Sequence, residues 1–180
     1  LACFGEAGVD VVASRALFGS CLYITTDSLP RLGVEAKVVD GCNLAEWEAA
    51  LDRPTAAVFL ETPTNPLLEI VDLPAVSKLA HAQGATVIVD NVFSTPMLQR
   101  PMELGAAIVV YSPTKHIDGQ GRAMGGASLC KQPFSDDHLK QFTRHAGPSI
   151  SPSNTGSFLK GLETLHIRLH QDGCNAAAAA

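Results

Sequence analysis

A single lysine stands directly after a short apolar run, with two hydroxyl side chains beside it. The run 108–111 (Ile-Val-Val-Tyr) is β-branched and bounded by glycines, which predicts a buried strand, and Ser112, Thr114 and Lys115 follow its end. Removing water from a lysine amine favours its neutral form, which is a usable nucleophile or base at neutral pH. The stretch therefore predicts amine chemistry at Lys115, against the alternative of an exposed lysine just past a strand end.

Other polar side chains also follow apolar runs. Asn65 comes shortly after the run 56–60, and Asp90 comes directly after the run 86–89. In open parallel sheets, ligands bind beyond the carboxyl ends of the strands. We therefore expect Asn65 and Asp90 to lie at the same edge of a sheet as Lys115.

Several other functions are weakly supported. Residues 112–115 match the Ser-x-x-Lys signature of acyl-serine hydrolases, but the chain contains neither of the partner triplets Ser-Asp-Asn and Lys-Thr-Gly. A glycine-rich nucleotide loop ending in Lys-Ser or Lys-Thr is absent, and so is a GxGxxG motif after the first strand. His166 and His170 are spaced to share a metal on one helix face, but no Glu follows the first and no third ligand is near, so a solvated face is the stronger interpretation.

The chain alternates between apolar runs and segments with helical spacing. This order predicts an α/β fold, a mostly parallel sheet with helices on both faces. Three helix starts are expected to be capped, by Asn43 with Glu46 as its partner, by Asp72, and by Ser135, whose helix would turn Phe142 inward. Strands are expected at 9–13, 34–39, 56–60, 86–89, 108–111 and 126–130, and helices after Asn43, after Asp72, around 97–104, at 135–145 and at about 153–170.

Composition limits the partners. The chain has 180 residues, enough for one domain, and a net charge of −5 without a basic cluster, so neither nucleic acid nor an anionic membrane is expected as a partner. The five cysteines include no CxxC pair, which favours reduced thiols in the cytoplasm. No apolar stretch is long enough to cross a membrane. The start at Leu1 and the terminal alanines indicate a piece of a longer protein.

One cofactor, pyridoxal phosphate, uses all of the strand-end residues together. It requires a lysine for its aldehyde, a carboxylate for its ring nitrogen, hydroxyls for its phosphate and an aromatic ring for stacking. The candidate residues are Lys115 as the Schiff-base lysine, Asp90 at the pyridine nitrogen, Ser112 and Thr114 at the phosphate, Phe18 on the ring face and Asn65 at the ring hydroxyl.

The order and spacing of three segments resemble a known family. Residues 61–66 (Glu-Thr-Pro-Thr-Asn-Pro), 89–91 (Val-Asp-Asn) and 112–115 (Ser-Pro-Thr-Lys) are similar to those of the pyridoxal-phosphate enzymes of cysteine and methionine metabolism. Phe18, where most members have tyrosine, and residues 116–122 (His-Ile-Asp-Gly-Gln-Gly-Arg) most resemble the branch that joins sulfide to O-succinylhomoserine.

The resemblance implies the large domain of a fold-type I enzyme. Residues 1–165 would form part of that domain, and residues 166–180 would begin the connection to a C-terminal domain. Family members are longer, and their glycine-containing phosphate loop and substrate-binding arginine lie in segments not found here. The implied reaction is γ-replacement on a homoserine ester by sulfide, in a homotetramer built as a dimer of dimers. The alternatives are a cystathionine γ-synthase, a γ-lyase of the same family, or a catalytically inactive fragment that binds the cofactor.

Overall fold

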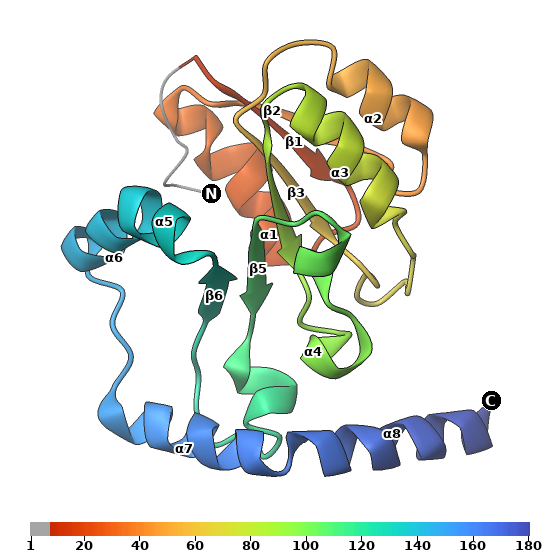
Figure 1. The fold of residues 1–180 in the computed structure, drawn as a ribbon, viewed down its shortest axis with the longest axis vertical. Coiled ribbons are helices and arrows are strands. Elements are labelled where there is room, and N and C mark those ends of the chain that lie inside the picture. Colours follow the sequence, from red (N-terminus) through yellow and green to blue (C-terminus); the bar gives the residue numbers. More distant parts are fainter. Residues whose placement is uncertain (1–7) are drawn as a thin grey trace.

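Six strands form one sheet in the order β2-β1-β3-β4-β5-β6 in the computed structural model, which describes residues 8–180 (Figure 1). The first five strands are parallel, and β6 is antiparallel to β5. This confirms the predicted α/β class with a mostly parallel sheet. The strands are β1 (Asp10–Ser14), β2 (Glu35–Val39), β3 (Ala57–Glu61), β4 (Thr86–Asp90), β5 (Ile108–Tyr111) and β6 (Ala127–Cys130).

Helices and helical turns connect the strands, with 3₁₀ and π-helical turns labelled η. The prolines near several starts fit the first turn of a helix, where the missing N–H has no partner to lose. The elements are α1 (Gly19–Tyr23), η2 (Ile24–Ser28), η3 (Pro30–Leu32), α2 (Leu44–Ala50), α3 (Leu73–Ala82), α4 (Thr95–Leu98), η4 (Pro101–Leu104), η5 (Pro113–Ile117), α5 (Gln132–Phe134), η6 (Ser135–Leu139), α6 (Lys140–Ala146), α7 (Pro152–Glu163) and α8 (Leu165–Ala179).

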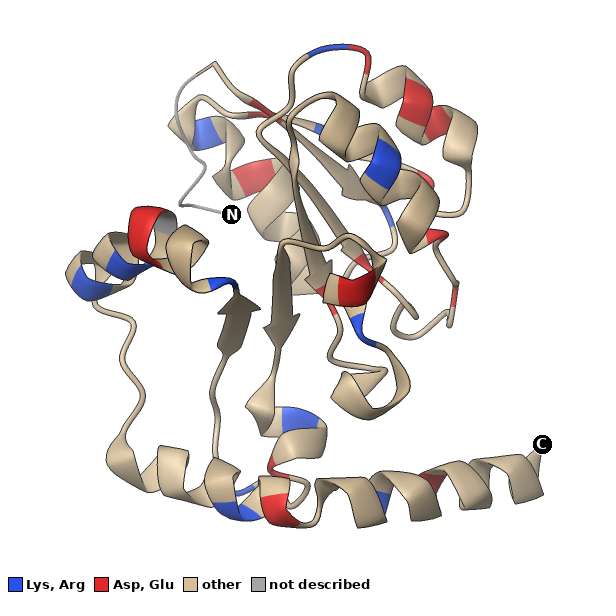
Figure 2. Ribbon diagram, viewed as in Figure 1, with Lys and Arg blue, Asp and Glu red and all other residues tan. Residues whose placement is uncertain are grey.

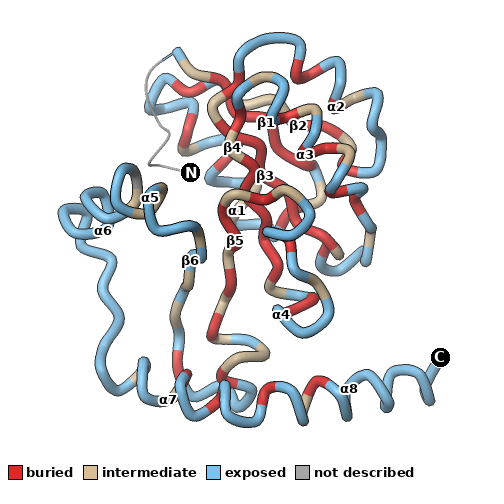
Figure 3. Tube along the Cα trace, in the orientation of Figure 1, coloured by how far each residue is buried: buried red, intermediate tan, exposed pale blue. Residues whose placement is uncertain are grey.

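Apolar cores lie on both faces of the sheet. On one face, α2 and α3 cover the strands with fully buried side chains such as Trp47 and Val76. On the other face, the segment from Leu17 to Leu29 packs on Phe59 and Ile88. Strands β1 and β3 are buried at every position, as expected for central strands of a sheet covered on both sides (Figure 3).

Two of the predicted helix caps are present. The Oδ1 atoms of Asn43 and Asp72 accept hydrogen bonds from backbone N–H groups in the first turns of α2 and α3. Glu46 does contact Asn43, but at its side chain rather than its backbone: the Oε1 of Glu46 accepts the Nδ2 of Asn43 at 3.2 Å. The Oε2 of Glu46 accepts the backbone N–H of Asp40 at 2.8 Å, so the same carboxylate also holds the loop after β2.

The helix expected at 135–145 begins earlier than predicted. Lys131 is its N-cap, and Ser135 lies within the helical run, because Pro133 is compatible with a first helical turn. Phe142 is 40% exposed, so its predicted inward position is wrong. The last predicted helix is two helices, α7 and α8, divided at Thr164.

Helices α7 and α8 form a long arm beyond the carboxyl end of β5 (Figure 1). Most of the arm is exposed, and Phe158, Gly161, Leu165 and Leu169 are its buried residues (Figure 3). Acidic and basic residues are scattered over the described chain (Figure 2). Among residues 8–180, no helix is long and apolar enough to cross a membrane.

Candidate cofactor site

A cavity of about 140 Å³ opens at the carboxyl ends of β3, β4 and β5. Its walls come from four separate segments of the chain, which the parallel sheet brings to one edge. Five of the six predicted site residues line it, and Thr114 does not. The lining residues are Phe18, Glu61, Asn65, Asp90, Val92, Phe93, Ser112 and Lys115.

Lys115 lies on the turn η5, which begins two residues after the end of β5. Ser112 has an extended backbone, and its carbonyl accepts the N–H of Lys115 at 3.0 Å. Farther along the turn, the carbonyl of Lys115 accepts the N–H of Gly119 at 2.8 Å. Lys115 itself is exposed, so its expected withdrawal from water is not found in this chain, because the lysine lies where the cavity opens outward.

Two acids lie side by side at the floor of the cavity. Glu61 ends β3, Asp90 ends β4, and the two are direct neighbours in the parallel register. Their side chains point to the face that α1 covers, because Phe59 and Ile88, two residues earlier, belong to the core on that face. Both carboxylates are buried, and burial raises the pKa of each.

Asp90 is the acid with fewer hydrogen bonds among residues 8–180. Its Oδ1 accepts the backbone N–H of Val92 at 3.0 Å, which opposes the rise in its pKa, and no Lys, Arg or His of residues 8–180 forms an ion pair with it. A buried carboxylate that faces a cavity is stabilised by a cationic ligand group. This geometry fits the predicted contact between Asp90 and a protonated ring nitrogen.

Glu61 has both oxygens engaged. Its Oε2 accepts the backbone N–H of Phe18 at 2.8 Å, and its Oε1 accepts that of Asn65 at 3.1 Å. The sequence prediction missed Glu61 as a site residue. The signal was present, since Glu61 follows a continuous apolar run as Asp90 does.

Phe18, Asn65 and Ser112 are the other predicted residues that line the cavity. Phe18 is the N-cap residue of α1 with a ring that is 50% exposed, Asn65 is exposed on the loop after β3, and Ser112 follows β5. The hydroxyl of Thr114 instead pairs with the backbone of Gly125, accepting its N–H at 2.9 Å and lying 3.3 Å from its carbonyl. Thr114 thus joins the lysine turn to the strand β6 segment, and its phosphate role stays a prediction.

A larger hollow of about 640 Å³ continues from this cavity toward α8. Lys115 and Asn65 belong to both, and Arg168 and Asp172 on α8 line the outer part. The two spaces together could hold a cofactor and a small substrate, with the lysine between them.

An arginine from the arm clamps the lysine turn. The guanidinium of Arg168 donates to the carbonyls of His116 at 2.8 Å and Ile117 at 3.2 Å, the two residues after Lys115. It also donates to the carbonyl of Gly161 at 2.9 Å and, through Nε, to the hydroxyl of Thr164 at 3.1 Å. One side chain therefore connects α7, α8 and η5.

Gly161 lets the arm lie against the same turn. A Cβ atom at this position would stand 2.0 Å from the carbonyl oxygen of Ile117 and 3.1 Å from the Cα atom of Asp118. Only a residue without a side chain allows so close an approach. The backbone of η5 is thus packed directly on α7.

The turn continues into an acid that is satisfied locally. The carboxylate of Asp118 is buried and accepts the backbone N–H of Arg122 at 2.7 Å and its Nε at 3.0 Å. These hydrogen bonds hold the pKa of Asp118 below its usual range. Asp118 therefore orders the loop between η5 and β6, and it is not among the residues that line the cavity.

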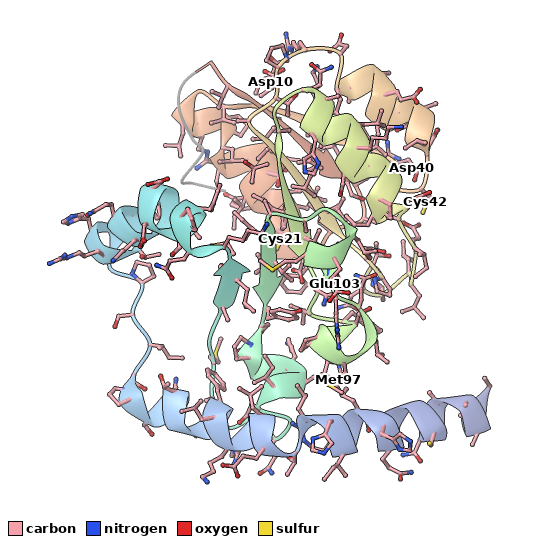
Figure 4. The ribbon with its side chains drawn as sticks, viewed as in Figure 1. Asp10, Cys21, Asp40, Cys42, Met97 and Glu103 are labelled. Carbon is pink, nitrogen blue, oxygen red and sulfur yellow. The ribbon has the colours of Figure 1, made fainter. Side chains whose placement is uncertain are left out.

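Cys21 lies against the acid pair from the α1 side. Its thiol packs beside the core of that face (Figure 4), and burial, with Asp90 and Glu61 nearby, raises its pKa to about 11. Cys21, Cys42, Cys130 and Cys174 are all free thiols, whereas Cys3 lies outside the described residues. Cys21 is half-buried and packs as an apolar side chain against the core on that face of the sheet.

Comparison with known proteins gives one consistent family. The family model for the Cys/Met metabolism PLP-dependent enzyme matches residues 1–180. An O-succinylhomoserine sulfhydrylase of Mycobacterium tuberculosis is 52% identical over 170 residues, which cover 94% of this chain and 42% of the relative. An L-methionine gamma-lyase of Fusobacterium nucleatum is 40% identical over 176 residues, covering 95% of this chain and 44% of the relative.

A solved structure agrees in fold. The cystathionine gamma-lyase from Lactobacillus plantarum, complexed with L-serine, superposes with a TM-score of 0.86 and 32% identity, covering 90% of this chain and 42% of that one. The chain thus spans less than half the length of the relatives that it matches.

Proposed function

Since the chain belongs to the family of Cys/Met metabolism PLP-dependent enzymes, with pyridoxal phosphate as its cofactor, we propose that it forms the cofactor-binding part of an O-succinylhomoserine sulfhydrylase. The 52% identity to the sulfhydrylase supports this activity over that of the more distant lyase. Phenylalanine at position 18 favours the same branch. The observation that carries the proposal is the cavity in which the amine of Lys115 and the buried carboxylate of Asp90 share one space.

The reaction proposed is a replacement at the γ carbon of O-succinylhomoserine. Hydrosulfide forms a C–S bond as the C–O bond to succinate breaks, giving homocysteine and succinate without any change in oxidation state. Pyridoxal phosphate, when bound, supplies an electron sink for charge that develops on the substrate carbons. The remaining steps are proton transfers and positioning by the chain itself.

Each candidate residue has one role in this scheme. Lys115 attaches the cofactor and moves protons at the α, β and γ carbons of the substrate, which its open position between the two hollows allows. Asp90 stays ionised by pairing with the ring nitrogen. Phe18 stacks on the ring, Asn65 donates to the ring hydroxyl, and Ser112 with Thr114 donates to the phosphate.

The domain limits and the assembly belong to the same proposal. We place the large-domain part at residues 1–165 and the connection to a further domain at 166–180. The protein would work in the cytoplasm as a homotetramer, a dimer of dimers, on a homoserine ester and sulfide.

The experiment has two arms. Borohydride reduction of the full-length protein with pyridoxal phosphate, followed by peptide mass spectrometry, is expected to place a phosphopyridoxyl group on Lys115, and Lys115→Ala is expected to lose it. O-Succinylhomoserine is then supplied with sulfide, with cysteine or alone. Preference for cysteine would assign a cystathionine γ-synthase, and release of ammonia without a nucleophile would assign a γ-lyase. Binding without any turnover would leave a cofactor-binding protein that is not an enzyme.

A further inference from the structure

Glu61 lines the cavity without a role in the scheme above. It is 4% exposed at the end of β3, and its two carboxylate oxygens accept N–H groups from segments that are far apart in the chain. One is Phe18, 43 residues earlier, and the other is Asn65 on the following loop.

We propose that Glu61 is a positioning residue that fixes Phe18 and Asn65 on the two sides of the cofactor, by accepting one backbone N–H from each. The proposal rests on the assignment of this cavity to pyridoxal phosphate. Glu61 acts through these two residues and does not itself contact the reacting atoms.

Neither of the two residues is held in place by packing. The ring of Phe18 is 50% exposed, and the side chain of Asn65 is exposed, so the apolar core does not fix either side chain. What sets their positions is the backbone. At Phe18 the backbone is held by Glu61 before α1 begins, because no side chain caps that helix. Removing the acceptor would release the backbone N–H groups of Phe18 and Asn65 together.

Only a carboxylate can accept from both sides. A glutamine of the same shape has one carbonyl oxygen and one amide nitrogen, so one of the two N–H groups would face another donor. Burial raises the pKa of Glu61, and the N–H of Phe18 opposes this most strongly, while Asp90 raises the pKa further and the N–H of Asn65 lowers it. The two N–H donors thus stabilise the ionised carboxylate of Glu61 and partly offset the cost of burying it.

The test compares three variants of the full-length protein without and with cofactor. Glu61→Gln is expected to accelerate amide hydrogen exchange at Phe18 or Asn65 by roughly 10-fold or more in the cofactor-free protein, since a charge-assisted hydrogen bond is lost. It is also expected to weaken the Kd for pyridoxal phosphate, measured by titration, by roughly 10- to 100-fold. Glu61→Asp keeps the charge but is one methylene shorter, and it is expected to fall between wild type and Glu61→Gln in both measurements.

Glu46→Gln is the matched control. Glu46 also accepts a backbone N–H, from Asp40 at 2.8 Å, but lies away from the cavity. Its variant is expected to accelerate exchange at Asp40 alone and to leave the Kd unchanged.

The outcomes separate the two proposals. If wild type binds the cofactor while both Glu61 variants keep wild-type exchange at Phe18 and Asn65 and wild-type Kd, the positioning role is refuted and the proposed function stands. If wild type fails to bind pyridoxal phosphate but Glu61→Gln still accelerates exchange, the hydrogen-bonding role holds and the cofactor assignment fails. Should Glu61→Gln fail to fold, Glu61→Asp decides by the same two measurements.

Discussion

The contact between α7 and the lysine turn predicts opposite effects for two glycine substitutions in one helix. Gly161→Ala would put a Cβ atom 2.0 Å from the carbonyl oxygen of Ile117, whereas Gly156→Ala would meet nothing within 4 Å. Both changes gain roughly 0.8–1 kcal/mol of helix propensity, so this gain cancels when the two variants are compared.

The remaining difference comes from overpacking. To restore an ordinary contact of 3.4 Å, the carbonyl of Ile117 must recede by roughly 1.4 Å, and the atom that must move is backbone rather than the end of a flexible side chain. Overpacking costs about 1–3 kcal/mol, and the upper end applies here. Gly156→Ala is therefore expected to be more stable than Gly161→Ala by about 3 kcal/mol, and more stable than wild type.

Urea unfolding followed by circular dichroism measures this difference, and a common slope for both variants would show that the unfolded state is unchanged. Because Ile117 follows Lys115 by two residues, the same displacement is expected to lower kcat of the full-length enzyme by roughly 100-fold in Gly161→Ala. Equal stability of the two variants would refute the direct contact between α7 and η5.

Two further predictions concern ionisable groups. Asp118→Asn is expected to be less stable than wild type at neutral pH, because the pKa of Asp118 is lowered in the folded protein. The contribution of the Asp118 carboxylate to the free energy of unfolding is complete above the unfolded pKa of about 3.9. It is lost as the pH falls through the lower folded pKa. Urea unfolding at several pH values measures this, and a gap that persists in strong acid would contradict it. Cys21, with a pKa of about 11, is expected to be alkylated at pH 7 far more slowly than exposed Cys174, because only roughly 1 in 10,000 of its thiols is ionised. Mass spectrometry follows both sites, and equal rates would contradict the burial of Cys21.

The sheet could be predicted because most of its strands are continuous runs of apolar residues. A run such as 56–60 contains no polar residue, so a strand formed from it is covered on both faces. This burial is typical of parallel strands that are connected by helices. The direction of β6 could not be read in this way, because side-chain alternation is the same in both directions. Strand β6 is antiparallel because the chain leaves the carboxyl end of β5 and enters β6 at that same edge of the sheet. No crossover helix between β5 and β6 carries the chain back to the amino end of β5.

The site was predictable where chemistry follows a strand end and not where it depends on distant backbone. Asp90 ends β4 and Lys115 follows the end of β5 by four residues, so the sheet places them together. The hydrogen bonds between the hydroxyl of Thr114 and the backbone of Gly125 could not be predicted, because no local pattern in the sequence marks the return of the chain to that turn, and the phosphate role of Thr114 stays a prediction. Arg168 lies 52 residues from the carbonyl that it clamps, and nothing in its local sequence marks that contact.

The clamp by Arg168 also sets an order of events during synthesis. Strands β3 and β4, which carry Glu61 and Asp90, and the turn η5, which carries Lys115, emerge first. The 52 residues from 117 to 168 need roughly 3 to 10 s more at 5–20 residues per second. Until then the nascent chain holds its acids at the sheet edge with a lysine turn that lacks its guanidinium tether. A chain interrupted before residue 168 would therefore lack the contact between α8 and the lysine turn.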